Sequence, residues 1–109
     1  MEHVGKDLNK VISAFHYPVY YGGNAKVATT MVPTATTEFH VYKLEWTPAS
    51  MQIFVDDKLF HTLPNSPSIP YNQNFLMILN IAMGGNLGGP IDPSFTSTTF
   101  EIDYVRVYQ

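Results

Sequence analysis

Cysteine is absent from the 109 residues, which excludes a disulfide framework, a thiolate nucleophile and cysteine-based metal sites. Basic residues are few: six Lys and Arg are scattered without a run among nine acidic residues, and the formal net charge is -3. A basic stripe that could neutralise phosphates is missing, so we expect no nucleic-acid partner. No stretch reaches the roughly 20 apolar residues of a membrane-spanning helix, so we expect no membrane partner either.

Helical periodicity is also missing over any useful length, and the chain has no internal repeat or low-complexity tract. Short runs rich in Tyr, Phe, Val and Thr fill the chain instead. Turn residues separate these runs at intervals of about 8 to 12 residues. About seven such strands predict an all-β fold, an antiparallel β-sandwich. The length allows one domain at most.

The strand prediction also covers the pairing of neighbouring runs. Met51–Val55 and Lys58–Leu63 flank an Asp-Asp pair, which predicts a hairpin. Tyr42, Leu44 and Trp46 alternate with charged residues, so one face of their strand is expected in the core and the other in solvent. The runs expected to form strands are 11–21 with an interruption at Pro18, 26–32, 38–46, 51–55, 58–63, 75–83 and 99–109.

The run 75–89, FLMILNIAMGGNLGG, is expected to hold the central strand. Its first part is apolar except for Asn80 and ends at two glycine pairs, which is typical of a strand covered on both faces. An unpaired buried amide costs about 1 to 3 kcal/mol, so Asn80 needs hydrogen-bond partners or access to a wetted groove. Asn80 is therefore either a site residue or an Asn satisfied by neighbouring backbone.

Carboxylates are the remaining candidates for chemistry. The four histidines lack the spacing of a zinc site, and no Ser stands in a GxSxG elbow. Glu2 lies beside Met1 and Val4, an apolar setting that favours a protonated general acid; the alternative is a solvated Glu. Asp103 is open to three roles: pairing with Arg106, capping a turn, or binding a hard cation such as calcium.

Three motifs resemble, in order and spacing, the C-terminal half of the family 16 glycoside hydrolases, especially laminarinase-type endo-β-1,3-glucanases. They are FHVYKLEWTPASMQIFVDD, FLMILNIAMGGNLGGP and FEIDYVRVYQ. The resemblance implies a concanavalin-like β-jelly roll, of which residues 1–109 form a single partial domain that starts inside the catalytic strand.

The resemblance also implies a function, which is retaining endohydrolysis of β-1,3 or mixed β-1,3-1,4 glucosidic bonds. The implied partner is a β-glucan oligosaccharide or polysaccharide, and the implied location is secreted or cell-surface. The reaction requires no cofactor. The family carries a calcium site on its convex face, to which Asp103 of DYVRVY corresponds.

The segment Met1-Glu2-His3-Val4-Gly5 resembles the tail of the family's E-x-D-x-x-E motif, which makes Glu2 the acid/base. The nucleophile and the assisting Asp of that motif are not among residues 1–109. Retaining hydrolysis needs two carboxyls about 5 to 5.5 Å apart, so Glu2 alone cannot perform it. The nearby-loop candidates for a second carboxylate, none of which matches the motif, are Asp7, Glu38 and Asp92.

The resemblance implies further substrate-binding residues. His16 corresponds to a groove histidine, Asn80 to the groove Asn of an NxAxGG motif, and Asn86 lies in the loop that follows it. Leu87 stands where the family often has a Trp. Trp46 matches the family's EW position, where it serves core packing or sugar stacking.

Two functions from other classes stay open beside hydrolysis. One is a β-glucan-binding module without turnover, and the other is a structural half-sandwich. Under each of the three readings we expect a homo-oligomer or strand exchange, since open sheet edges and an uncovered apolar face would otherwise meet water.

Overall fold

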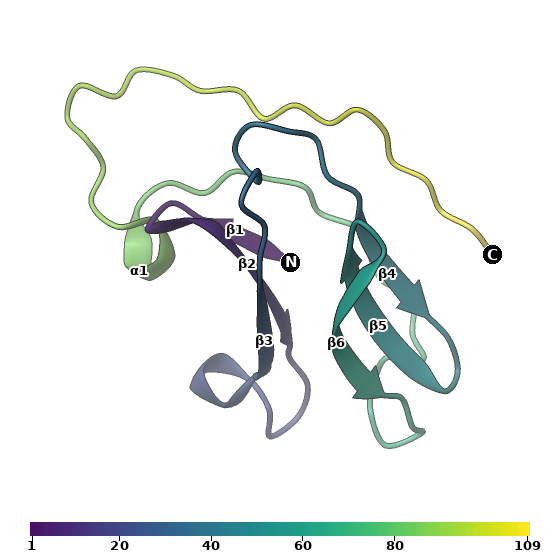
Figure 1. The fold of residues 1–109 in the computed structure, drawn as a ribbon. Helices are drawn as coiled ribbons and strands as arrows, with labels where there is room; N and C mark the ends of the chain where they lie inside the picture. The colour runs from purple at the N-terminus through teal and green to yellow at the C-terminus, as the bar shows by residue number, and fades with distance from the viewer.

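The computed structural model describes all of residues 1–109 and shows an all-β fold of two three-stranded antiparallel sheets (Figure 1). The predicted antiparallel sandwich is confirmed. No helix has both the length and the apolar character needed to cross a membrane. The first sheet contains β1 (Glu2–Val4), β2 (Asp7–Phe15) and β3 (Lys26–Met31), and the second contains β4 (Tyr42–Trp46), β5 (Ser50–Val55) and β6 (Lys58–Pro64). Two short helical turns complete the elements: η1 (Gly22–Asn24) and α1 (Gly85–Gly88).

The hairpin between β5 and β6 has the tight turn that the sequence predicts. Asp56 and Asp57 both have positive φ angles, 47° and 63°, as the two central residues of a type I′ turn require. Aspartate tolerates this region better than most residues because its short side chain bonds locally. The turn sets the register that pairs Val55 with Lys58.

Alternate residues of β2 form the centre of the core. Phe15 packs with Met51, Ile53 and Leu63 of the second sheet. Val11, in the middle of β2, packs with Val32 and Val55. Since full burial of each such side chain contributes about 1.5 to 3 kcal/mol, these two clusters hold the sheets face to face.

One polar contact crosses the core between the sheets. Ser13 is the single buried polar residue, and its Oγ lies 3.0 Å from Nδ1 of His61 on β6. The Phe15 ring lies 4.6 Å from the imidazole, centroid to centroid. Burial lowers the pKa of His61 below its ordinary value, because the charged imidazolium would lose solvation here.

The strand predicted for 11–21 ends earlier than expected. β2 stops at Phe15, and the chain then turns through Pro18 and Val19 between Tyr17 and Tyr20, which exchange backbone hydrogen bonds of 2.9 and 2.8 Å. The prediction is wrong beyond Phe15 because proline has no N–H to donate and favours a turn.

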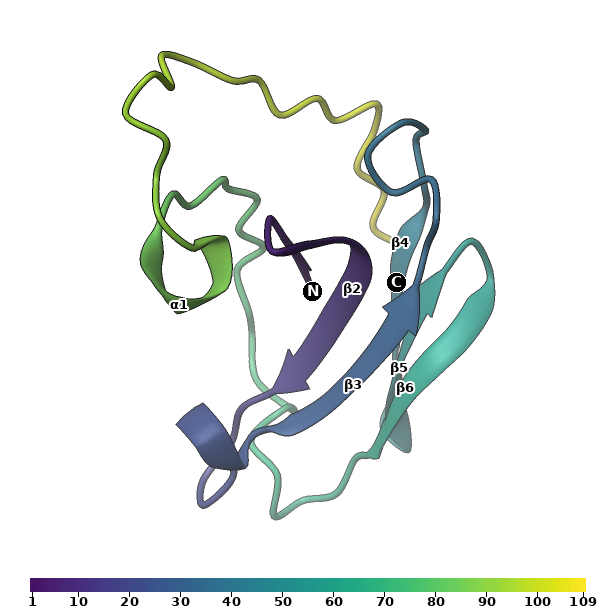
Figure 2. The same cartoon turned by 60° about the vertical axis from the view of Figure 1, so that its left-hand side comes forward.

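The expected central strand and last strand do not form within this chain. Residues 75–83 and 99–109 are extended but belong to neither sheet, and they run across one end of the molecule (Figure 2). The side chains of Leu76 and Ile78 are 91% and 78% exposed. The prediction of a strand covered on both faces is therefore wrong for residues 1–109, because no strand of this chain pairs with the segment.

The unpaired segments make the molecule more extended than a compact domain. The radius of gyration is 15.3 Å, against about 13 Å for a compact domain of this length. The structure has 37 backbone hydrogen bonds, roughly half the number expected for a fully paired chain of 109 residues. The stable part of the molecule is thus the pair of sheets formed by residues 2–64.

We expect Val11→Ala to destabilise the protein by about 2 kcal/mol, since Val11 is 1% exposed and its loss leaves a cavity. The matched control is Val27→Ala on β3, where the side chain is 56% exposed, with an expected change within about 0.5 kcal/mol. Denaturant unfolding measures both. Equal effects would contradict the proposed core.

We expect the His61–Ser13 contact to make stability fall as pH drops. The pKa of His61 is lowered in the fold, so the unfolded chain binds the proton first. This penalty is absent above the ordinary value of 6.5 and develops as pH falls below it. His61→Gln should flatten this part of the curve of unfolding free energy against pH. An unchanged slope in that variant would contradict the assignment.

Candidate functional site

Glu2 lies on the face of the first sheet that is turned away from the second sheet. The register pairs Glu2 with Ile12, and Ile12 with Thr29, so these three side chains share one face. Val11 and Phe15 occupy the opposite, buried face. Glu2 is therefore an exposed carboxylate on the outer face of a paired strand.

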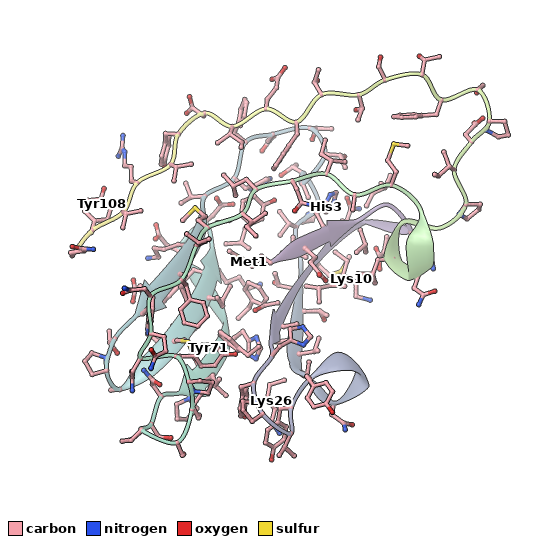
Figure 3. All side chains as sticks on the ribbon, turned by 180° about the vertical axis from the view of Figure 1, so that it is seen from behind. Met1, His3, Lys10, Lys26, Tyr71 and Tyr108 are labelled. Atoms are coloured by element: carbon pink, nitrogen blue, oxygen red, sulfur yellow. The ribbon has the colours of Figure 1, made fainter.

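A shallow hollow separates β1 from the segment that follows Phe75. It measures about 360 Å³ and is lined by His3 and Gly5 on one side and by Ile81 and Met83 on the other. His3 donates a hydrogen bond from Nε2–H to the Leu8 carbonyl, and Figure 3 shows it beside the extended segment. Neither Glu2 nor Asn80 is among the lining residues, although each has a chain neighbour that is.

The loop Gly84–Gly89 is held against the β1–β2 turn. Lys6 Nζ donates a hydrogen bond to the Asn86 carbonyl. A Cβ placed on Gly5 would lie 3.7 Å from the Gly88 carbonyl oxygen, so the two backbones approach closely. Three strand residues rise about 10 Å, so this contact lies at roughly that distance along β1 from Glu2.

Asn80 is exposed in this chain and its side chain makes no hydrogen bond with another residue. The argument from a buried amide therefore does not apply here, because the surrounding apolar run is itself uncovered.

His16 and Trp46 lie on different parts of the sandwich. His16 follows β2 directly and is exposed, and its carbonyl accepts a hydrogen bond of 2.8 Å from Tyr71 Oη. Trp46 pairs with Met51, so it lies on the core side of the second sheet, where it contacts the Phe75 ring edge-on at 5.7 Å. Continued alternation along β2 would place His16 on the Glu2 side.

Asp103 is exposed in the extended segment 99–109 and makes no hydrogen bond or ion pair. No group of three His, Cys, Asp or Glu side chains in the chain is arranged to hold a metal ion. Arg106 does not pair with it but lies over the Tyr104 ring at 4.4 Å. The side chains present do not by themselves fit a calcium site, and calcium at Asp103 stays a prediction.

The three candidates for a second carboxylate each have other neighbours. Asp7 forms an ion pair with Lys10 at 3.6 Å. Asp92 accepts hydrogen bonds from the Ser94 N–H at 2.8 Å and hydroxyl at 2.7 Å, which lowers the pKa of its carboxyl. Glu38 lies in the β3–β4 connection. None of the three forms a hydrogen bond or ion pair with Glu2.

One well-formed polar cluster was missed at the sequence level. His40 Nδ1 lies 2.5 Å from Asp56 Oδ2, and Nε2 lies 3.0 Å from Thr34 Oγ1. A signal for it was present, since the predicted hairpin and the register that pairs Tyr42 with Val55 bring the residues before Tyr42 beside Asp56. The hydroxyl of Thr34 could not have been found in this way.

The family description "Glycosyl hydrolases family 16" matches residues 1–106. The chain belongs to this family.

Two relatives of the chain are glucanases by name. The "Beta-glucanase" of Rhodothermus marinus is 40% identical over 122 residues, covering 100% of this chain and 43% of that protein. The "Glucan endo-1,3-beta-glucosidase" of Cryptopygus antarcticus is 38% identical, covering 96% of this chain and 46% of that protein. The chain thus spans less than half the length of these relatives.

A solved structure agrees with the fold. The crystal structure of LamAcat from Zobellia galactanivorans matches with a TM-score of 0.76 and 41% sequence identity. The match covers 86% of this chain and 38% of that chain.

We expect Gly84→Ala to loosen the loop Gly84–Gly89. Gly84 has φ +72°, and a Cβ there would lie 3.3 Å from Ile91 Cδ1, so alanine costs about 1 to 2 kcal/mol in backbone strain alone. Amide hydrogen exchange of the loop should rise about fivefold or more. Gly23→Ala is the control, since it has nothing within 4 Å and no positive φ. Equal exchange in both variants would contradict the assigned strain.

Proposed function

We propose that this chain is part of a retaining β-glucan endohydrolase of the laminarinase type, which cleaves β-1,3 or mixed β-1,3-1,4 bonds with Glu2 as acid/base. The observation that carries the proposal is the position of Glu2, exposed on the outer face of β1 in a member of family 16. The names of the two glucanase relatives support the substrate class.

The chemistry assigns two successive roles to Glu2. As an acid it would protonate the glycosidic oxygen while a carboxylate attacks the anomeric carbon. As a base it would then remove a proton from the water that releases the glycosyl group. The attacking carboxylate must lie about 5 to 5.5 Å from Glu2, and we assign it to a segment outside residues 1–109.

The same proposal assigns sugar-binding roles to three residues. Asn80, His16 and Asn86 carry amide or imidazole groups that can hydrogen-bond to hydroxyls, and all three are exposed. Asn86 is positioned by the contact between its carbonyl and Lys6. We assign Trp46 to packing, since its strand register places it on the core side of the second sheet.

Location, domain extent and assembly follow as parts of this proposal. A β-glucan polymer is too large to enter a cell intact, so its hydrolase would act as a secreted or cell-surface protein. Residues 1–109 would form part of one jelly-roll domain, and additional strands or a second copy would cover 75–83 and 99–109. Calcium at Asp103 would then need backbone carbonyls from outside this chain.

In an assembly that supplies the attacking carboxylate, we expect Glu2→Gln to lower the rate of laminarin hydrolysis by about 10²- to 10⁴-fold, because the amide cannot donate or accept the proton. Reducing-sugar release measures the rate, and calorimetry with laminarin oligosaccharides should show unchanged binding. Glu101→Gln, an exposed carboxylate in the extended segment 99–109, is the control and should keep its rate. Full activity in Glu2→Gln would overturn the acid/base assignment.

A β-glucan-binding module without turnover is the second candidate. The observation in its favour is that two of the three candidate carboxylates, Asp7 and Asp92, are engaged by Lys10 and Ser94 in this chain. If the protein bound oligosaccharides but released no reducing sugar from laminarin, this candidate would be favoured over hydrolysis.

A further inference from the structure

The connection between the two sheets is fixed at a point far from Glu2 in the sequence. It leaves β3 at Met31 and reaches β4 at Tyr42. Along it, Thr34 and His40 meet Asp56 from the β5–β6 turn, and we name these three residues the clamp.

Every polar atom of the clamp side chains has a partner. His40 Nδ1 lies 2.5 Å from Asp56 Oδ2, and His40 Nε2 lies 3.0 Å from Thr34 Oγ1. Asp56 Oδ1 accepts a hydrogen bond of 2.9 Å from the Val41 N–H, and the Asp56 N–H donates one of 3.0 Å to the Val41 carbonyl. The His40 side chain is only 8% exposed. A fully partnered group of this kind has no free donor for a ligand.

The clamp lies directly beside one of the two core clusters. Val32 and Val55, which pack with Val11, are chain neighbours of the connection and of the turn. The Val32 N–H donates a hydrogen bond of 2.7 Å to the Asn9 carbonyl of β2. A hollow of about 330 Å³ lies at the same place, lined by both valines and by the clamp. Opening the clamp would therefore admit water to this cluster.

The charges around His40 come from three parts of the fold. Asp56 belongs to the β5–β6 turn, Glu38 to the connection itself, and Lys58 of β6 lines the same hollow. Tyr42 of β4 places its ring 6.5 Å from the imidazole. The two carboxylates outnumber the ammonium, so the local field favours a protonated imidazole.

We propose that the clamp is a pH-dependent contact between the β5–β6 turn and the connection that joins the two sheets. It stabilises the sandwich most when His40 is protonated and less when His40 loses its proton. In the protonated state Nδ1–H donates to a carboxylate of opposite charge, and Nε2–H donates to Thr34 Oγ1. Deprotonation removes the ion pair, and Thr34 must then donate its hydroxyl hydrogen to Nε2. The hydrogen bonds persist, but the charge that strengthened them is gone.

The pH range over which the clamp stabilises the fold follows from its two titrating groups. The hydrogen bond to Asp56 raises the pKa of His40 above its ordinary value of 6.5. Burial of the imidazole opposes this rise in pKa but does not cancel it. The stability from His40 is thus complete below 6.5 and is lost as pH rises through its pKa in the fold. The hydrogen bond from His40 lowers the pKa of Asp56 below its ordinary 3.8, so that stability is present above 3.8 and lost at still lower pH. The clamp therefore contributes most to stability between pH 3.8 and pH 6.5.

The test is an NMR titration of the histidine side chains of the protein between about pH 5 and pH 9, with the backbone amides followed in parallel. We expect the His40 midpoint above 6.5, and we expect the amides of Val41 and Ala35 to titrate with the same midpoint. Asp56→Asn should lower the His40 midpoint, and Thr34→Val should lower it less. His16→Gln, an exposed histidine outside the clamp, is the matched control and should leave the midpoint unchanged.

The same variants are compared by denaturant unfolding. Between pH 6 and about pH 8 the unfolding equilibrium constant of the unmodified protein should rise several-fold more than that of His40→Gln. A His40 midpoint at or below 6.5 would overturn the proposal. It would equally be overturned if Val41 and Ala35 did not follow the His40 titration, since His40 would then titrate without moving the connection. Neither result bears on hydrolysis, so the proposal fails or stands separately from the assignment of Glu2.

Discussion

The hydrogen-bonding requirement of extended backbone governs this molecule. Each strand presents N–H and C=O groups along both edges, and only a neighbouring strand can satisfy them in a dry interior. Residues 2–64 meet this requirement with two three-stranded sheets, and all eight buried apolar residues lie among them. Residues 75–83 have a more apolar sequence than any of those strands but no strand pairs with them, and they stay exposed. Hydrophobicity alone therefore does not produce a strand.

The alternation of β2 places both the core and the candidate site. Because Val11 and Phe15 face the second sheet, Ile12 must face away from it, and the antiparallel register carries Glu2 to the same outer side. A shift of one residue between β1 and β2 would move Glu2 to the inner side. The packing that stabilises the sheets thus also determines where the carboxylate is presented.

The sequence was most informative where a few adjacent residues determine the structure. The two aspartates between Val55 and Lys58 predicted their hairpin correctly, because a tight turn depends on its own residues. It was least informative where distant segments meet. The pairing of His40 with Thr34 and Asp56 depends on how the connection folds back, and the failure of 75–83 to form a strand depends on which strands are available. The sequence motif identified Glu2 as a candidate catalytic residue. Its position on the outer face of the first sheet could be assigned only from the pairing of β1 with β2.

The same register argument separates the two roles open to Trp46. Trp46 pairs with Met51, which is 3% exposed, so its indole is on the side of the second sheet that faces the first. Glu2 is on the opposite side of the first sheet, so the thickness of the sandwich lies between the two side chains. Trp46 is 43% exposed, and β4 is an edge strand of its sheet. This placement favours core packing for Trp46, and sugar stacking there stays a prediction.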